Sequence, residues 1–468
     1  MIDIRQAMTD DKLFGGQFGA DSFAAWRALL SGFYGLELSQ ADLETFTLLT
    51  QRKEAPTGPF DELWLPIGRR GGKSLTAALL ALFEGPFKDH RAKLAPGEVA
   101  TCMVIAADRK QARAVMRYIT GMVDNNPMLS AMVVHQNSEA IEFDNSTVIE
   151  VHTASHRAVR GYTLAIVIMD ECAFWHVEGA NPDKDIVTAL RPALATLNGK
   201  LVALSSPYAK RGILWTAYKR YFATADKRVL VAQAPTLIMN PSLDPAIVEQ
   251  ALEEDREAAK AEYLAQFRGD ISTFLDIELI EQCARPKPLE LPPASNIAYR
   301  AFVDPAGGGG DEFTLSIGHK EGLCTVIDLV RGRKGSPAEI VAEYARILQN
   351  YGINSVSGDR YAGRWPRDEF NRFGIDYQVS ELDRSGLYLE FLAALNSGQV
   401  ELPPCDKTTR QFASLERRTS RSGRDSIDHP PGGNDDRANA VAGVVAYMNQ
   451  RHANVAMILR KRNRRVAA

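Results

Sequence analysis

Residues 65–76 read Leu65-Pro66-Ile67-Gly68-Arg69-Arg70-Gly71-Gly72-Lys73-Ser74-Leu75-Thr76. A short apolar run (63–65) leads into this stretch, and an apolar run of helical type (75–82) follows it. This order predicts a strand, a tight loop and a helix. In such a loop the glycines let backbone N–H groups turn inward on a phosphate, and the N-terminus of the helix adds partial positive charge.

The loop has the composition of a variant P-loop. Lys73 is expected to reach the β- and γ-phosphates of ATP, and the Ser74 hydroxyl to bind Mg²⁺. The usual first glycine of such a loop is Ile67 here, so other glycines must supply the permissive backbone. The remaining ATP-binding positions are Gly68, Arg69, Arg70, Gly71 and Gly72. A basic glycine turn that binds no nucleotide is the alternative interpretation.

A second apolar run, about 100 residues further on, ends in two carboxylates. Residues 164–171 read LAIVIMDE, the pattern of a buried strand followed by Asp170 and Glu171. Asp170 is expected to hold the hydrated Mg²⁺, and Glu171 to orient and deprotonate the attacking water. A helix N-cap followed by a surface acid is the alternative. The order of the two motifs favours the catalytic interpretation.

Two further positions extend this candidate site. Arg160 stands just before the acidic strand, where an arginine finger from the same or a neighbouring subunit would neutralise transition-state charge. A surface ion pair is the alternative role. A third apolar strand (200–204) ends in Ser205, Ser206 and a proline, a position that senses the γ-phosphate in helicase-like motors. A plain strand-to-turn junction is the alternative there.

Length and composition bound the class of protein. A chain of 468 residues with 45% hydrophobic and 24% charged residues is typical of a globular protein of two or three domains. The N-terminal residues have no signal-peptide pattern, and no apolar run approaches the ~18 residues of a membrane helix, so we expect a soluble cytoplasmic protein. Five dispersed cysteines without a CxxC pair favour reduced thiols and no zinc site.

The net charge of −3 neither requires nor excludes a nucleic-acid partner. Four prolines within 286–293 predict a stiff linker and a domain boundary. The predicted segments are a helical lead-in (1–60), a P-loop ATPase domain (61–275), a proline-rich linker (276–297), a second domain (298–450) and a basic tail (451–468).

The second domain places acids at three topological points. One predicted strand delivers Asp304 to a glycine-rich turn, a later strand ends at Asp359, and a C-terminal helix begins at Asp435 and Asp436. With a β-meander and a crossover helix between them, this is the ribonuclease H-like layout. Two Mg²⁺ or Mn²⁺ ions held by such carboxylates activate water and stabilise the leaving oxygen of a phosphodiester. Turn capping is the alternative role for any one aspartate.

Taken in order, these motifs resemble the large subunit of the terminase of tailed bacteriophages or prophages. The resemblance extends from about residue 23 to residue 448. It rests on GRRGGKS, VRGY, IVIMDE, ALSSP, APTLIMNPSLD, VDPAGGGGDEFT, SGDRYAG and GGNDDRANA.

The resemblance implies an α/β chain in which an ASCE or RecA-like P-loop domain precedes a ribonuclease H-like nuclease. The implied activities are ATP-driven translocation of double-stranded DNA into a procapsid and endonuclease cutting of the concatemer in the cytoplasm of the bacterial host. The implied partners are a small terminase subunit, a portal protein and further copies of the chain in a ring, a pentamer when assembled.

By the same resemblance, ATPase roles fall on Lys73, Ser74, Asp170 and Glu171, coupling on Ser205 and Ser206, and catalytic arginine roles on Arg69 and Arg160. The nuclease metals fall to Asp304, Asp359 and one of Asp435 and Asp436, with Asp436 favoured. Two alternatives stay open. One is a translocase or helicase-like ATPase whose C-terminal domain only binds DNA, and the other is a nucleotide-gated structural component with little turnover.

Overall fold

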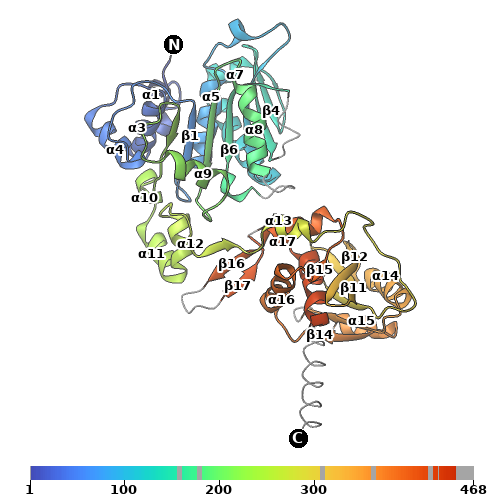
Figure 1. The fold of residues 1–468 in the computed structure, drawn as a ribbon. Helices are drawn as coiled ribbons and strands as arrows, with labels where there is room; N and C mark the ends of the chain where they lie inside the picture. The colour runs from blue at the N-terminus through green and yellow to red at the C-terminus, as the bar shows by residue number, and fades with distance from the viewer. Residues whose placement is uncertain are drawn as a thin grey trace. The chain divides into compact units, whose positions relative to one another are not determined.

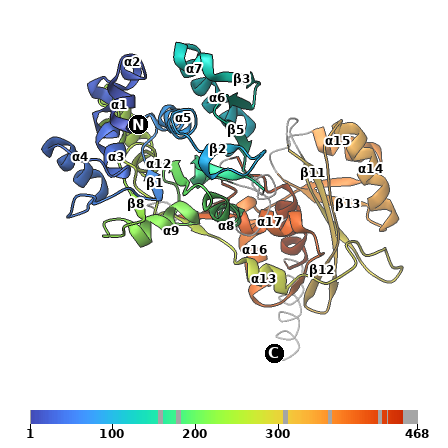
Figure 2. The ribbon, with the colours of Figure 1, turned by 90° about the horizontal axis from the view of Figure 1, so that it is seen from above.

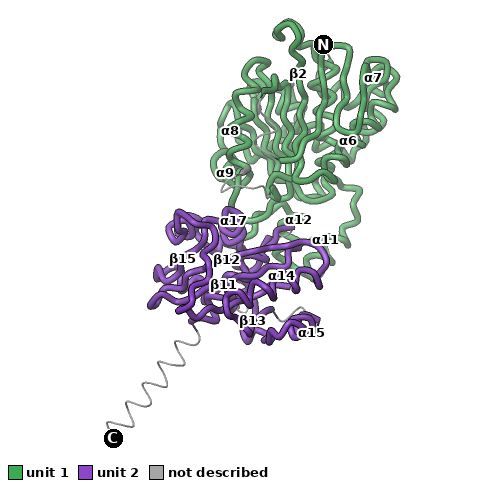
Figure 3. The backbone as a smooth tube through the Cα atoms, turned by 90° about the vertical axis from the view of Figure 1, so that its right-hand side faces the viewer, with its two compact units in different colours: residues 1–269 green, residues 270–468 purple. Residues whose placement is uncertain are grey.

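The computed structural model describes residues 2–154, 161–175, 182–305, 311–359, 365–419, 425–430 and 432–449. Arg160 and the tail at 451–468 therefore lie outside the described residues. The chain divides into two compact units, residues 1–269 and 270–468 (Figure 3). Each unit is built around its own large β-sheet.

The sheet of the first unit has the strand order β3-β4-β5-β2-β6-β7-β1-β8 (Figure 1). From β5 to β8 every neighbouring pair is parallel, and β3, β4 and β5 form the antiparallel excursion expected near residues 131–152. The strands are β1 (Glu62–Pro66), β2 (Ala100–Ala106), β3 (Val133–Gln136), β4 (Ala140–Phe143), β5 (Thr147–Thr153), β6 (Thr163–Asp170), β7 (Lys200–Ser205) and β8 (Val229–Val231).

The helices of this unit cover both faces of the sheet, which explains why its central strands are buried along almost their whole length. Figure 2 shows α5 and α6 on one side and α8 and α9 on the other. The longer helices are α3 (Ala24–Phe33), α4 (Gln40–Thr50), α5 (Lys73–Glu84), α6 (Arg109–Asp124), α8 (Pro182–Leu194), α9 (Gly212–Tyr221) and α11 (Pro245–Glu254). The shorter ones are α1 (Ile4–Thr9), α2 (Gly15–Phe18), α7 (Pro127–Met132), α10 (Thr236–Met239) and α12 (Arg256–Glu262).

Successive side chains of one strand enter different cores. In β2, Cys102 and Val104 join the core that contains α5 and α6, whereas Met103 and Ile105 join the core that contains α8 and α9. The lead-in helices belong to the first of these cores, because Trp26 and Phe46 are fully buried in it. The predicted lead-in is therefore part of the first unit.

The second unit has the sheet order β14-β13-β10-β11-β12-β15. The meander β10-β11-β12 is antiparallel, and β13 and β14 add in parallel beside β10. The strands are β10 (Arg300–Asp304), β11 (Phe313–Glu321), β12 (Cys324–Arg333), β13 (Ser355–Gly358), β14 (Asp376–Val379) and β15 (Val400–Glu401). A separate three-stranded sheet consists of β9 (Ile271–Thr273), β16 (Glu416–Thr419) and β17 (Asp425–Asp428).

Helices again cover both faces of the larger sheet. The crossover helix α14 and α15 pack on one face, and α13, α16, α17 and the helical residues 436–449 pack on the other. Their bounds are α13 (Ile277–Gln282), α14 (Pro337–Asn350), α15 (Trp365–Arg372), α16 (Arg384–Asn396) and α17 (Asp406–Ser414). The last helix approaches β10 closely, since a Cβ atom on Gly443 would overlap the ring of Phe302.

The boundary between the units differs from the predicted one. Residues 276–297, expected to form a linker, belong to the second unit, and the division falls at 269/270. Arg285 is only 8% exposed and donates from Nη1 to the Ile327 carbonyl at 2.8 Å, while Leu291 N donates to the Asp328 carbonyl at 2.9 Å. The proline-rich stretch is thus packed against β12. Within the described ranges, no helix has the length and apolar character needed to cross a membrane.

Candidate functional site

The loop after β1 does not need a glycine at its first position. Ile67 continues the β ladder, donating its N–H to the Ser205 carbonyl at 3.0 Å and bridging to Ala234, and it is fully buried. The loop needs a glycine one residue later, because other atoms lie very close to the backbone of Gly68. A Cβ atom on Gly68 would lie 2.7 Å from the Tyr263 carbonyl and would overlap the Thr236 hydroxyl. The departure at Ile67 is therefore compatible with a phosphate-binding loop.

Lys73 opens α5 directly after Gly72, whose φ of +86° lies in the left-handed region that favours glycine. The lysine side chain is 6% exposed. Its Nζ donates to Ser206 Oγ at 2.9 Å and to the carbonyl of Ile67 at 3.2 Å, and it lies 3.5 Å from Glu171 Oε1. The ammonium group is thus held at the loop itself, beside the carboxylate at the end of the acidic strand.

Asp170 ends β6, which is separated from β1 by β7 alone. Ser74 Oγ donates to Asp170 Oδ2 at 3.4 Å, so the two predicted Mg²⁺ ligands are adjacent. Burial, and after it the charge of Glu171, raises the pKa of Asp170 to about 7, although Lys73 and Ser74 oppose the shift. Asp170 Oδ1 is buried and has no hydrogen-bond partner among the described residues, an acceptor that a hydrated Mg²⁺ would satisfy.

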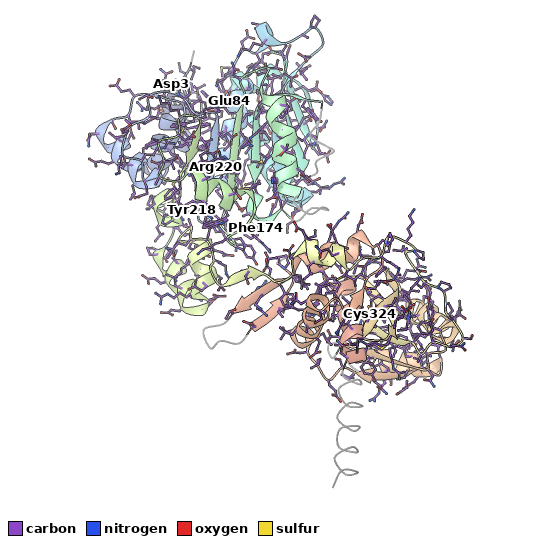
Figure 4. All side chains as sticks on the ribbon, in the orientation of Figure 1. Asp3, Glu84, Phe174, Tyr218, Arg220 and Cys324 are labelled. Carbon is purple, nitrogen blue, oxygen red and sulfur yellow. The ribbon has the colours of Figure 1, made fainter. Side chains whose placement is uncertain are left out.

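Glu171 adopts a left-handed backbone conformation (φ 49°, ψ 42°), which is uncommon for a residue other than glycine. Its Oε2 accepts from the Ser205 hydroxyl at 3.0 Å and from Ser206 N at 3.2 Å. Ser205 and Ser206 therefore connect Glu171 to Lys73, and their predicted coupling role stays a prediction. The segment after Glu171 is held as well, because the ring of Phe174, labelled in Figure 4, lies 5.3 Å from that of Tyr208.

Three side chains from distant parts of the unit hold the loop backbone. Trp26 Nε1 donates to the Gly71 carbonyl at 2.8 Å, Thr236 Oγ1 to the Arg69 carbonyl at 2.8 Å, and Asn240 Nδ2 to the Arg70 carbonyl at 3.0 Å. Sequence reasoning missed these anchors, although Thr236 and Asn240 belong to the APTLIMNPSLD motif that carried part of the resemblance. The Trp26 side chain is fully buried.

The loop arginines are oriented differently from Lys73. Arg69 is an exposed side chain whose Nη1 donates to Glu262 at 3.0 Å, and this hydrogen bond raises its pKa. Arg70 is exposed and has a φ of +65°. Arg69 is thus engaged with α12, and its predicted catalytic role stays a prediction. Arg160 lies outside the described residues, and its role stays a prediction too.

In the second unit, one buried amide joins two of the predicted acids. Asp304 ends β10, Asp359 follows β13, and these two strands are parallel neighbours. Asn439 Nδ2 donates to Asp304 Oδ2 at 2.9 Å and to Asp359 Oδ2 at 3.2 Å. All three side chains are buried. The topology thus brings Asp304 and Asp359 together as the layout predicted, with Asn439 as a partner that sequence reasoning did not single out.

The third acid of this cluster is Asp435. It is 3% exposed, and its oxygens accept from Tyr388 Oη at 2.6 Å and Arg384 Nη1 at 3.4 Å. The same arginine lies 3.9 Å from Asp359 Oδ2. Asp436 instead accepts from the Glu312 backbone N–H at 3.1 Å. The contacts therefore favour Asp435, whereas the sequence interpretation favoured Asp436. The two aspartates are neighbours, so the position at which the last helix begins determines which carboxylate faces the cluster.

The pKa shifts in this cluster indicate that a nearby cation would stabilise it. Burial raises the pKa of Asp304 to about 8; Asn439 and Arg384 oppose this shift, whereas Asp435 and Asp359 add to it. Burial also raises the pKa of Tyr388, and the charge of Asp435 adds to that shift. Ionisation of Asp304 beside these neighbours is therefore unfavourable unless a cation is close to it.

The donor set fits Mg²⁺ or Mn²⁺, which prefer oxygen ligands. Asp304, Asp359 and Asp435 supply carboxylates, and Asn439 Oδ1 is buried with no hydrogen-bond partner in the described part of the chain. Across those same residues no three acidic, histidine or cysteine side chains converge as a ready metal-binding group. Arg384 and Asn439 donate to the carboxylates that a metal ion would take.

The strand order and the contacts of Lys73, Asp170 and Glu171 define the first unit as a P-loop ATPase domain, as predicted. Residues 47–198 match the family model described as the ATPase domain of the terminase large subunit. The resemblance to terminases is thereby confirmed for this part of the chain. No curated protein matches the chain.

Several solved structures are similar to this chain. The large terminase of bacteriophage HK97 has 17% identity and a TM-score of 0.40, with 90% of this chain and 99% of that one covered. A large terminase of a thermophilic bacteriophage, solved with ADP, has 15% identity and a TM-score of 0.38 over 87% of this chain and 98% of that one. The terminase nuclease of thermophilic phage G20c has 19% identity and a TM-score of 0.30 over 39% of this chain and 89% of that one. Because these TM-scores are low, the fold assignment rests on the strand orders themselves.

Proposed function

We propose that this protein is the large subunit of a phage terminase, an ATP-driven motor that moves double-stranded DNA into a procapsid and a metal-dependent endonuclease that cuts the concatemer. The ATPase assignment rests on the position of Glu171, which Ser205 and Ser206 hold opposite Lys73. The family match over residues 47–198 supports the same assignment.

In the ATPase unit, Lys73 and the loop N–H groups bind the nucleotide phosphates, and Ser74 and Asp170 hold the Mg²⁺. The bound Mg²⁺ supplies neutralisation of the charge on the phosphoryl oxygens. A phosphate is a better partner for the lysine ammonium than the Ile67 carbonyl and the distant Glu171 oxygen. Binding therefore releases Glu171 Oε1 to accept a proton from the attacking water, while Ser205 keeps the carboxylate oriented.

Ser206 is suited to report the state of the nucleotide. Its hydroxyl accepts from Lys73 and its N–H donates to Glu171, so it contacts both groups that face the γ-phosphate. It also directly follows β7, the strand that lies between the P-loop strand and the acidic strand. Loss of the γ-phosphate changes the partners of Lys73 and is transmitted along β7. Arg160 is proposed as the arginine finger of this site, acting in the same or a neighbouring subunit, and Arg69 as the loop arginine.

In the second unit, Asp304, Asp359 and Asp435 are the proposed ligands of two divalent ions. The ions supply an activated water and stabilise the leaving oxygen of the phosphodiester. If this unit only bound DNA, four buried polar side chains of one cluster would have no functional role: Asp304, Asp359, Asp435 and Asn439. In a nuclease centre these side chains would bind the metal ions or hold the metal ligands in place.

The partners follow from this role. Double-stranded DNA is the substrate of both units, a small terminase subunit selects it, and the motor works as a ring of identical chains, a pentamer, on the portal of a procapsid. The work is done in the cytoplasm of the bacterial host. These finer assignments rest on the resemblance and are part of the proposal.

The test uses paired variants of the full chain. Glu171→Gln should bind a fluorescent ATP analogue normally, lose DNA-stimulated hydrolysis by about 10²-fold or more, and still cut DNA. Asp435→Asn should lose metal-dependent cutting and keep hydrolysis, whereas Asp436→Asn should keep both. Wild-type hydrolysis in Glu171→Gln would show that the base is misassigned. Cutting that depends on Asp436 and not on Asp435 would overturn the ligand assignment.

A further inference from the structure

The guanidinium group of Arg384 lies among three carboxylates from separate parts of the second unit. Its Nη1 is 3.4 Å from Asp435 Oδ1 and 3.5 Å from Asp428 Oδ1, and its Nη2 is 3.9 Å from Asp359 Oδ2. Asp359 follows β13, Asp428 ends β17 and Asp435 precedes the last helix. One cation thus neutralises an acidic cluster that includes two of the proposed metal ligands.

These contacts are long and shared. A tightly bound arginine in the same unit shows the contrast, because Arg331 reaches the two oxygens of Glu290 at 2.8 and 2.7 Å. All three Arg384 distances lie at or beyond the long end of the hydrogen-bond range. The Arg384 side chain is also 30% exposed, whereas Asp435 beside it is 3% exposed. The guanidinium therefore touches the cluster from its solvent side without a committed partner.

The backbone at Arg384 is anchored independently of its side chain. Arg384 is the first residue of α16, and the preceding Asp383 accepts from Gly386 N at 2.8 Å. Ser385 Oγ accepts from Ile427 N at 3.0 Å. One turn further, Tyr388 holds Asp435 at 2.6 Å. The N-terminal end of α16 and the position of Asp435 can therefore stay unchanged when the guanidinium moves away.

A second observation indicates that Arg384 is not the final partner of this cluster. Asn439 is fully buried and uses its Nδ2 on Asp304 and Asp359, yet its Oδ1 has no donor in the described ranges. Arg384 makes no hydrogen bond to this acceptor in the described part of the chain, so the acceptor is left for another partner. An oxygen without a donor inside a carboxylate cluster is what a divalent cation satisfies.

We propose that Arg384 is an exchangeable counter-ion that becomes the phosphate-binding residue of the nuclease centre. In the metal-free protein it neutralises Asp359, Asp428 and Asp435. Divalent cations that take Asp359 and Asp435 would repel the guanidinium, which then turns to the phosphodiester of the DNA strand to be cut. Its planar fork matches two phosphate oxygens. The proposal rests on the nuclease function proposed above and adds a residue that no predicted role covers.

The experiment compares Arg384→Gln, which removes the charge, with Arg384→Lys, which keeps the charge but loses the fork. Arg372→Gln is the matched control, since Arg372 pairs with Glu369 at 2.7 Å on an exposed part of α15. Binding of Mn²⁺ to the full-length chain is followed by the EPR signal of free Mn²⁺, without DNA. Cleavage of supercoiled plasmid is measured in parallel.

Arg384→Gln should bind Mn²⁺ at least about threefold more tightly than the wild type, because a competing cation is gone. Arg384→Lys should bind Mn²⁺ as the wild type does. Arg384→Gln and Arg384→Lys should both cut plasmid about 10²-fold more slowly, because each loses the pair of guanidinium donors that would bind the phosphate. Arg372→Gln should match the wild type in both assays.

Weaker or unchanged Mn²⁺ binding by Arg384→Gln would overturn the exchange. Wild-type cleavage by Arg384→Lys would overturn the phosphate-binding role, and this variant decides the question if Arg384→Gln fails to fold. A wild-type protein that neither binds Mn²⁺ nor cuts DNA would instead contradict the proposed nuclease function, so the two failures are distinguishable.

Discussion

The indole Nε1 of Trp26 donates a 2.8 Å hydrogen bond to the carbonyl of Gly71, joining a helix of the N-terminal lead-in to the phosphate-binding loop. The indole is fully buried in the core that contains α5. A Cβ atom on Gly72 would lie 3.0 Å from the same nitrogen, so the glycine and the tryptophan fit together. The lead-in is thus a structural support of the nucleotide site.

Trp26→Phe should weaken nucleotide binding more than it disturbs the fold. The change keeps an aromatic ring in the core but leaves the Gly71 carbonyl without its buried donor, which costs about 1–3 kcal/mol. We expect a higher KM for ATP and a lower affinity for a fluorescent ADP analogue. The control is Trp215→Phe, because Trp215 stacks on Tyr218 and makes no indole hydrogen bond within the described residues. Equal nucleotide affinities in the two variants would contradict the supporting role.

Gly68→Ala should abolish nucleotide binding or destabilise the ATPase unit. The added methyl group would meet the Thr236 hydroxyl and the Tyr263 carbonyl, and neither the loop nor α10 can move without breaking the hydrogen bond from Thr236 to Arg69. Gly58→Ala is the matched control, since a Cβ atom added at Gly58 would meet nothing within 4 Å. A thermal unfolding scan with and without ATP compares them, and wild-type stabilisation by ATP in Gly68→Ala would be the contrary result.

Ser205→Ala should lower kcat for ATP hydrolysis about tenfold or more with little change in KM. A hydrogen bond to a charged group contributes about 1.5–3 kcal/mol, and this one orients the proposed base without touching the nucleotide. Ser130→Ala removes a hydroxyl of α7 that, among the described residues, donates only to the Val123 carbonyl, and the change should leave kcat unchanged. Steady-state ATPase assays decide. An unchanged kcat in Ser205→Ala would mean that Glu171 needs no such support.

Local sequence signals predicted the chemistry of the ATPase unit because both motifs follow buried strands. The strand before the loop of Lys73 is apolar over residues 63–65 and the strand before Asp170 over 164–169, and parallel strands present their carboxyl ends at one edge of the sheet. The anchors Trp26 and Thr236 carry no such signal. Their hydrogen bonds close loops of 45 and 167 residues, and only the folded topology shows which backbone carbonyl each side chain meets.

In the second unit the sequence predicted the two strand-end acids but not their setting. Asp304 and Asp359 follow strands, so topology alone brings them together. The choice between Asp435 and Asp436 depends on where the last helix begins, and helix ends are among the least certain features of a sequence-based prediction. The sequence did not single out Arg384 as a site residue, because an arginine at the start of a helix is most simply interpreted as a solvated side chain. The proline-rich boundary was misplaced because its packing against β12 is a long-range contact.

The metal-free protein should become less stable as the pH rises from about 4 to about 8. The pKa of Asp304 is about 8 in the folded chain and near 3.8 when unfolded, so the folded state holds an extra proton throughout this interval. The stability that this proton provides is complete below the unfolded pKa and is lost as the pH passes through the folded one. The slope is on the order of 1 kcal/mol per pH unit.

Asp304→Asn removes the titrating group, so in EDTA this variant should be more stable than the wild type at pH 8 and similar to it at pH 4. Exposed Asp376→Asn serves as the control and should follow the wild type. Urea denaturation monitored at several pH values measures the effect. A wild-type stability that is flat or rises between pH 5 and pH 8, with no difference from Asp304→Asn, would show that Asp304 is ionised in the metal-free protein.

The most direct test of two active sites in one chain is cleavage of supercoiled plasmid by the full-length protein, with Mg²⁺ and with Mn²⁺. The panel compares the wild type with Asp304→Asn and Lys73→Ala. We predict metal-dependent nicking or linearisation by the wild type and by Lys73→Ala, and none by Asp304→Asn, which still hydrolyses ATP. Equal cleavage by Asp304→Asn and the wild type would contradict the assignment of the second unit as a nuclease.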